Sequence, residues 1–512
     1  MANFFRTIQN ILDASRRGDS LWSIYERLEK SEFLLKNEQK TAFKLLFDTL
    51  ISVLNEEKAY ELSKFPTDVL EIYSPTISTP VAQKLAQFGG ISLFLNELKY
   101  LDETSVKEFA QFKGRELSLN GFNYLDEVIA EAISQFKGYR LSLNGLKQLA
   151  EGSAKAISQF KGYRLSLNGL QQIDELEAKA LSQVERCDLF LTGLKQIDER
   201  IAKALAQFQG GCLYLDGLEK LDETTTKILA QFKCDCLSLN GLKQIGEITL
   251  KLLSPFKGTL LLNGVEELDE SVAKTLAHFQ GKGICLDGVK QIDETIAKVL
   301  TQFQCVGFSL NGLKEINESV AKTLAQYKGK QLGLCGLQQI GEATAKALAQ
   351  FKGEMFFLNG IKQIDETAAK ALAQYKGERL FLSGLQQIDE AVAKAFVQYK
   401  GEYCILNGLQ QIDESIAKAL AQFQHKSFHL DGLQQIDEVT AKALVQYKGE
   451  SLSLDGLKRI DEKTAKALAQ YGGVLSLNGV KQIDEATAKA LAQFKGELYT
   501  TEKIKAQIKK HK

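Results

Sequence analysis

Proline is scarce in this sequence, with four in 512 residues, so little in the chain would interrupt a long regular array. No run of about eighteen apolar residues occurs, and no membrane span is therefore predicted. The eight cysteines fall at irregular positions, which favours reduced thiols in a cytosol over a disulfide framework. The opening Met-Ala-Asn-Phe-Phe-Arg lacks a basic segment followed by an apolar one. We therefore expect a cytoplasmic location, with export by a route that needs no signal peptide as the alternative.

Charge of one sign is not in excess either, since 64 lysines and arginines balance 64 aspartates and glutamates. A neutral chain without a basic stripe argues against nucleic acid as the main partner. The sequence contains no P-loop, no G-x-G-x-x-G and no G-x-S-x-G, and its four histidines stand at no fixed spacing from a serine or cysteine. We therefore predict no catalytic residues, no cofactor and no metal site, and expect that the protein is not an enzyme.

What the sequence does contain is one unit repeated seventeen times between about Gly90 and Gly496. The copy at Glu354–Gly377 reads E-M-F-F-L-N-G-I-K-Q-I-D-E-T-A-A-K-A-L-A-Q-Y-K-G. Its Asn-Gly slot recurs every 24 residues, with two steps of 23. A fixed period in this range predicts a solenoid, in which each coil buries its apolar face only by stacking on the next.

Within one copy, the apolar alternation at Phe356–Leu358 predicts a short strand with one face buried. Asn359-Gly360 then turns the chain, and glycine fills the second position in sixteen of the seventeen copies. Because glycine enters left-handed backbone space without steric cost, we expect a positive φ there. The Asn slot also accepts Asp, Thr, Ser and Cys in other copies, which favours a local role in capping the turn.

The second half of the copy predicts a helix. Asp365 is its expected N-cap, and Lys376-Gly377 is its expected end. Glu366 and Lys370 stand four residues apart, in the order that suits both an ion pair and the helix dipole. The predicted buried stripe comprises Ala369, Leu372 and Tyr375. An aromatic residue near the helix end in seventeen of eighteen coils, with Val184 as the exception, predicts a core spine of rings rather than a ligand channel.

The block L-x-L-N-G-L-x-x-I-D-E-x-x-A-K-A-L-A-Q-F-K-G resembles leucine-rich repeats of a bacterial type with a helical back, over about four fifths of the chain. This resemblance implies an α/β fold: a right-handed, curved β/α solenoid with a parallel sheet on the inner face and helices on the outer face. It also implies partner binding on the sheet face. In the usual motif the asparagine follows the strand's last leucine by three residues, whereas Asn359 follows Leu358 directly. The family's buried asparagine ladder is therefore not transferred to this chain.

Three regions are expected along the chain. Residues 1–66 do not repeat and predict an N-terminal helical cap domain, with helices at 3–15, 20–35 and 37–63. Residues 67–496 are expected to form the solenoid of about 18 coils. Residues 67–90 are a degenerate first copy, with a strand at Leu70–Ile72 and a helix capped by Thr79. Residues 497–512 begin one more strand, at Leu498–Thr500, and end in a basic cap helix with Ile504 and Ile508 facing inward. Contact with an anionic surface is the alternative for that helix.

The variable residues of the strands face away from the core, so we expect function on the sheet face. Stacked strands lie about 4.8 Å apart, which would gather one group of aromatic, apolar and basic side chains over four coils. The predicted partner-binding residues are Met355, Phe357, Arg379, Phe381, Tyr403, Ile405 and His429. Cys187, Cys212, Cys234 and Cys236 also lie close together, but a C-x-C spacing in a β-ladder favours incidental thiols over zinc.

The sequence thus favours a non-enzymatic scaffold that binds a protein partner on the sheet face of the solenoid. Two alternatives stay open: a structural protein that assembles with itself, and an effector whose activity resides in residues 1–66.

Overall fold

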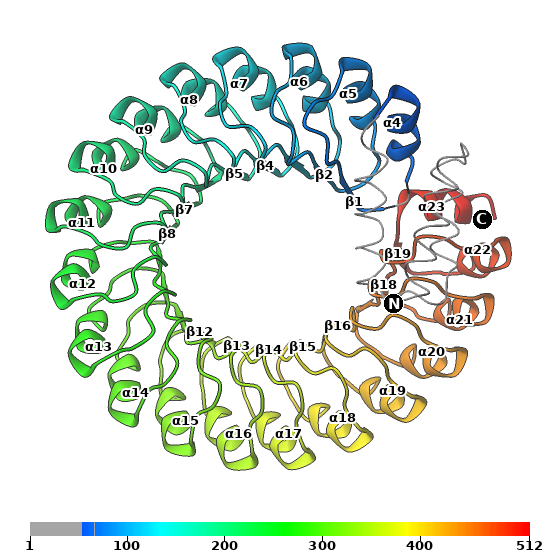
Figure 1. The fold of residues 1–512 in the computed structure, drawn as a ribbon. Helices are drawn as coiled ribbons and strands as arrows, with labels where there is room; N and C mark the ends of the chain where they lie inside the picture. The colour runs from blue at the N-terminus through cyan, green and yellow to red at the C-terminus, as the bar shows by residue number, and fades with distance from the viewer. Residues whose placement is uncertain (1–53, 66, 512) are drawn as a thin grey trace, which may run out of the picture. The chain divides into compact units, whose positions relative to one another are not determined.

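The computed structural model describes residues 54–65 and 67–511 (Figure 1). The helices predicted at 3–15 and 20–35, and most of the helix predicted at 37–63, lie outside the described residues. The described chain forms two compact units. The first runs through Leu242 and includes Phe256–Leu260, and the second comprises Lys243–Pro255 and the chain from Leu261 onward.

In the first unit, each coil consists of a three-residue strand, a turn and a short helix. Its strands are β1 Val69–Glu71, β2 Ser92–Phe94, β3 Glu116–Ser118, β4 Arg140–Ser142, β5 Arg164–Ser166, β6 Asp188–Phe190, β7 Cys212–Tyr214 and β8 Cys236–Ser238. Its helices are α4 Glu56–Ser63, α5 Thr79–Leu85, α6 Glu103–Ala110, α7 Glu127–Ser134, α8 Glu151–Ile157, α9 Glu175–Leu181, α10 Glu199–Leu205 and α11 Glu223–Leu229.

The second unit repeats the same coil. Its helices are α12 Glu247–Leu253, α13 Glu270–Leu276, α14 Glu294–Leu300, α15 Glu318–Leu324, α16 Glu342–Leu348, α17 Glu366–Leu372, α18 Glu390–Phe396, α19 Glu414–Leu420, α20 Glu438–Leu444, α21 Glu462–Leu468, α22 Glu485–Ala492 and α23 Glu502–Lys509. Its strands are β10 Gly283–Cys285, β11 Gly307–Ser309, β12 Gln331–Gly333, β13 Met355–Phe357, β14 Arg379–Phe381, β15 Tyr403–Ile405, β16 Ser427–His429, β17 Ser451–Ser453, β18 Val474–Ser476 and β19 Glu497–Tyr499. Strand β9, Thr259–Leu261, lies where the chain passes between the units.

The strands pair in parallel, and equivalent residues of consecutive coils lie opposite each other. Leu117 of β3 faces Leu141 of β4, and the same register runs from β1 to β8. In the second unit it runs from β10 to β19. Each unit curves, with its strands on the concave side and its helices on the convex side (Figure 1). The predicted α/β solenoid with an inner parallel sheet and outer helices is confirmed.

The core consists of columns of equivalent side chains. Leu141 at a strand centre and Leu143 just after that strand are fully buried. The aromatic rings near the helix ends stack on one another, as Phe112 and Phe136 do with their centroids 6.2 Å apart. Where the ring belongs to tyrosine, its hydroxyl reaches the preceding coil: the Tyr375 Oη donates to the Gly353 carbonyl at 2.8 Å. The predicted core spine is therefore confirmed.

The helices begin as predicted and end earlier. The Asp365 carboxylate accepts the Ala368 N–H at 2.8 Å, and Lys370 pairs with Glu366. Helix α17 ends at Leu372, because the next residues continue in a tighter turn in which the Tyr375 N–H donates to the Leu372 carbonyl at 3.0 Å. The expected end at Lys376-Gly377 was therefore wrong.

Strand boundaries are displaced by one residue from the predicted ones. The strand predicted at Phe356–Leu358 is β13, Met355–Phe357, and the first and last coils show the same displacement. Thr79 is the first residue of α5 and not its cap, a position that Ser78 occupies. The last helix, α23, agrees with the prediction, with Ile504 and Ile508 buried.

The turn glycines do not have the positive φ that we expected. At Gly145 and Gly360 the backbone lies outside the left-handed region. Glycine is required for a different reason: a Cβ on Gly360 would lie 1.9 Å from the carbonyl oxygen of Cys335, one coil earlier. The close approach of consecutive coils, and not the local turn conformation, excludes a side chain there.

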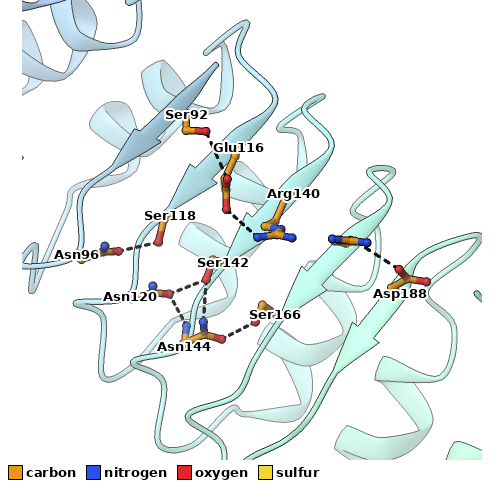
Figure 2. Close-up of polar contacts among 11 residues, drawn as sticks. Ser92, Asn96, Glu116, Ser118, Asn120, Arg140, Ser142, Asn144, Ser166 and Asp188 are labelled. Carbon is orange, nitrogen blue, oxygen red and sulfur yellow. Dashed lines mark hydrogen bonds and ion pairs between the residues drawn. The ribbon is translucent and has the colours of Figure 1, made fainter. Parts of the chain in front are cut away.

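Where the slot before the turn glycine holds asparagine or aspartate, its side chain in most coils bonds to the next coil and so forms a ladder. Asn120 Oδ1 accepts the Asn144 N–H at 2.8 Å and the Ser142 hydroxyl at 2.7 Å, and Ser166 donates to Asn144 at 2.6 Å (Figure 2). Aspartate serves equally, since Asp431 accepts the Asp455 N–H at 3.1 Å. The expected local turn-capping role was therefore wrong, and an inter-coil ladder takes its place.

Candidate functional site

The seven predicted partner-binding residues lie on four adjacent strands of the second unit, β13 to β16. We call them the aromatic patch: Met355, Phe357, Arg379, Phe381, Tyr403, Ile405 and His429. The register places Met355 opposite Arg379 and Phe357 opposite Phe381, then Arg379 opposite Tyr403, and Ile405 opposite His429. The structure thus brings together all seven residues in the order that the period implied.

These side chains face the concave surface because their neighbours in each strand fill the core. Phe356, Leu380 and Cys404 are fully buried beneath them, so the alternation of the strand turns the patch residues to the concave surface. Each of the seven patch side chains is half-buried. They therefore support one another laterally and still present their outer surface to a ligand.

Two contacts within the patch determine its shape. The rings of Phe357 and Phe381 stack with centroids 4.4 Å apart and an interplanar angle of 17°. Beside them, the Arg379 guanidinium lies over the Tyr403 ring, 5.1 Å from its centroid. Stacked rings and a cation over a ring both hold their side chains in fixed rotamers, so the patch is preorganised.

Arg379 differs from the other arginines at its position in the strand. In the first unit, Arg140 Nη1 lies 3.1 Å from Glu116 Oε1 (Figure 2), and Arg164 Nε lies 3.5 Å from Asp188 Oδ2. Among the described residues, no carboxylate lies within ion-pair distance of Arg379, and its buried Nε, like that of Arg164, has no hydrogen-bond partner. The nearby Glu354 is engaged by Lys330 at 2.7 Å. The patch therefore holds a cation that lacks an intramolecular anion.

The far edge of the patch carries a carboxylate. His429 Nδ1 lies 3.8 Å from Asp431 Oδ2, and the Ser453 hydroxyl donates to Asp431 Oδ1 at 2.5 Å. Burial alone would raise the pKa of Asp431, but hydrogen bonds from His429, Ser453 and the Asp455 N–H outweigh it and hold the pKa below its ordinary value. Asp431 is thus a fixed negative charge at neutral pH.

The first unit carries a concave surface of different character. Ser92 donates to Glu116 at 3.3 Å, and Glu116 pairs with Arg140, so a polar chain crosses three strands (Figure 2). The predicted site residues did not include a second stacked pair, Phe190 and Tyr214, with centroids 4.0 Å apart. Both residues occupy the same strand position as Phe357 and Phe381, so the register of aromatic residues was the signal that could have found them.

A third aromatic pair lies just before the strands. Tyr139 and Tyr163 stack 5.1 Å apart, and the guanidinium of Arg115 lies 5.2 Å from the Tyr139 centroid. Arg164 lies 5.6 Å from the same centroid. Arg164 is also paired with Asp188, whereas Arg115 lies over a ring without a described ion pair, as Arg379 does.

The four cysteines weighed as a zinc site all lie in the first unit. In residues 54–65 and 67–511, no group of three or more histidine, cysteine, aspartate or glutamate side chains is placed to hold a metal ion. Helices long and apolar enough to cross a membrane are likewise missing from the described chain.

The in-register strands, the backing helices and the inter-coil ladder together define a leucine-rich-repeat-like solenoid. No protein-family model matches the chain, and no curated protein does. Among solved structures, an internalin from Listeria monocytogenes aligns with 15% identity over 68% of this chain and 93% of its own, with a TM-score of 0.33. The mouse RP105/MD-1 complex aligns with 13% identity over 83% of this chain and 89% of the matched chain, with a TM-score of 0.42. The TLR13–ssRNA13 complex aligns with 15% identity over 87% and 69%, with a TM-score of 0.37.

Proposed function

We propose that this chain is a non-enzymatic protein-interaction scaffold and that the aromatic patch binds its partner. The segment it recognises presents a carboxylate beside a large apolar side chain. The observation that carries the proposal is the unpaired Arg379, held over Tyr403 and next to the stacked Phe357 and Phe381.

The chemistry of the patch supports this class of partner. Tyrosine and arginine are enriched among the residues that dominate binding energy in protein interfaces, and phenylalanine among interface residues in general. A carboxylate that reached Arg379 would form charge-assisted hydrogen bonds, which are roughly twice as strong as neutral ones. An apolar side chain beside that carboxylate would cover Phe357 and Phe381, whose exposed ring faces gain about 25 cal/mol for each Å² removed from water.

Charges around the patch favour one orientation of the bound partner segment. Asp431 lies at one edge, two coils beyond Arg379, and its neighbour Asp455 lies one coil further. A partner whose carboxylate lay over that edge would meet like charge, whereas one placed at Arg379 would not. We therefore expect the acidic residue of the partner at β14 and its apolar residues over β13.

The proposal is tested by replacing both stacked rings with serine, as Phe357→Ser with Phe381→Ser. The matched control makes the same change at the other stacked pair, Phe190→Ser with Tyr214→Ser. Bait chains of both kinds and of the wild type are used for affinity capture, and the captured protein is then titrated against each. We expect at least a tenfold loss of affinity, or about 1.4 kcal/mol, for the patch variant only. Equal affinity for all three chains would show that the aromatic patch does not bind the partner.

A second measurement on the same variants, the mass of the protein in solution, distinguishes the scaffold from a self-assembling protein. A solution mass well above 56.8 kDa in the absence of any partner, reduced by the patch substitutions, would assign the patch to contacts between copies of this chain. The cytoplasmic location stays a prediction, which is supported by eight cysteines that form no disulfide in the described chain.

A further inference from the structure

Two cysteines occupy the same position of adjacent strands. Cys212 begins β7, Cys236 begins β8, and the two residues are direct register partners. Leu213 and Leu237, the next residues, are fully buried, so both thiols lie on the opposite, concave side of the sheet. Neighbouring strands are about 4.8 Å apart, and a disulfide needs a Cα separation of about 4.4 to 6.8 Å. The backbone therefore places the two Cα atoms within the range that a disulfide spans.

The two thiols also interact directly. A hydrogen bond from the Cys236 side chain lowers the pKa of Cys212 and outweighs burial and the nearby carboxylates of Asp188 and Asp235, which act in the opposite direction. Cys212 is half-buried, whereas Cys236 is only 7% exposed. A small oxidant therefore reaches Cys212 first, and the hydrogen bond from Cys236 favours the ionised form of that thiol.

The other two cysteines of the first unit lack this reactivity. Cys187 and Cys234 are buried, and burial raises the pKa of each thiol to about 12. Because the thiolate is the nucleophile, these two residues stay protonated and inert near neutral pH. Cys212 is thus distinguished from its neighbours by both access and ionisation.

We propose that Cys212 and Cys236 form a dithiol that hydrogen peroxide converts reversibly into a disulfide. The Cys212 thiolate attacks one peroxide oxygen and becomes a sulfenic acid, while the other oxygen leaves as hydroxide and takes up a proton. The Cys236 sulfur then attacks the Cys212 sulfur and displaces the second hydroxide, which takes the Cys236 proton. Two thiols are oxidised, one S–S bond forms, and the peroxide is reduced to two waters.

The bond would add a covalent tie between two coils that are otherwise joined by hydrogen bonds. The ladder residue Asp216, which follows β7, accepts the Asn240 N–H at 3.0 Å and the Ser238 hydroxyl at 2.5 Å. Tyr214, at the third position of β7, stacks on Phe190. The disulfide would lie on this same concave surface, at the first position of the strands.

The test treats the full-length protein with hydrogen peroxide at neutral pH and maps its peptides by mass spectrometry without reduction. We expect a link between Cys212 and Cys236, a mass decrease of about 2 Da per chain for the two hydrogens lost, and reversal by dithiothreitol. Cys236→Ser is expected to leave Cys212 as a sulfenic acid that dimedone labels. Cys234→Ser is the matched control, which is expected to leave the link intact; circular dichroism confirms the fold of each variant.

Two results would overturn the proposal. One is a chain in which Cys212 stays reduced at peroxide concentrations that oxidise glutathione. The other is a link from Cys212 to Cys234, which Cys234→Ser would abolish.

Discussion

The side chain of Asn120 belongs to one coil and caps the next: its Oδ1 lies 2.8 Å from the backbone nitrogen of Asn144, 24 residues later (Figure 2). Asn144 repeats the contact with the N–H of Asn168 at 2.9 Å. The ladder satisfies a half-buried N–H that the three-residue strands leave unpaired. Register between coils therefore depends on these side chains as well as on the strands.

Replacing Asn120 by alanine is expected to destabilise the contact between its coil and the next. The Asn144 N–H would lose its acceptor, at a cost of about 1–3 kcal/mol. The measurement is amide hydrogen exchange at Asn144, since the opening of one coil is a local event in a repeat protein. Asn120→Asp is the control, because Asp216 accepts the same bond at 3.0 Å in its own coil. Equal exchange in both variants would contradict the ladder.

Gly360→Ala is expected to lower the melting temperature clearly. The added Cβ would lie 1.9 Å from the Cys335 carbonyl oxygen, so two coils would have to move apart. Gly472→Ala provides the control, because nothing lies within 4 Å of a Cβ built there. We expect that control to melt at the wild-type temperature or slightly above it, since alanine restricts the unfolded chain. Similar melting of the two variants would mean that the coils do not approach so closely.

Ala150→Asp is expected to stabilise the chain by about 1 kcal/mol. Ala150 is the N-cap of α8 and forms no side-chain cap, whereas Asp126 caps α7 by accepting the Ile129 N–H at 2.8 Å. Asp126→Ala should therefore cost a similar amount. Urea unfolding of the two variants measures both changes, and a destabilising Ala150→Asp would show that α8 begins elsewhere.

The capping aspartates predict a loss of stability in acid. Hydrogen bonds from backbone N–H groups lower the pKa of Asp365, Asp413 and Asp461. A carboxylate whose folded pKa lies below its unfolded value of about 3.9 stabilises the fold fully above that value. That stability disappears as the pH falls through the lowered folded pKa.

We therefore expect the melting temperature to fall steeply below about pH 4. Changing the three aspartates to asparagine should reduce this dependence, since Asn317 already caps α15 by accepting the Val320 N–H at 2.9 Å. Melting curves between pH 7 and pH 2 test the prediction. A triple variant with the same acid profile as the wild type would assign the acid sensitivity to other groups.

The repeat period alone was sufficient to predict which residues share a surface. Because every coil advances by the same number of residues, the slot occupied by Phe357 had to lie opposite that of Phe381, and it does. The helix cap at Asp365 and the buried Leu372 followed from local chemistry and were also confirmed.

What the sequence could not show is how closely two coils approach. Gly360 resembles a turn glycine in its own coil, and the atom that excludes a side chain belongs to Cys335, far away in the sequence. The sequence also could not show which charged side chains form ion pairs. Glu378 directly precedes Arg379, but only coordinates show that no described carboxylate lies within ion-pair distance of this arginine.

The central claim, that the aromatic patch recognises an acidic residue beside an apolar one, is tested most directly by selecting peptides from a random phage-displayed library on the immobilised full-length chain. Selection is repeated on Arg379→Met, which keeps the apolar stem, and on Arg140→Met as the matched control. We predict that wild type and Arg140→Met enrich peptides with aspartate or glutamate next to an aromatic or large aliphatic residue, and that Arg379→Met loses the acidic preference. The same acidic consensus on all three chains, or no consensus on any, would contradict the claim.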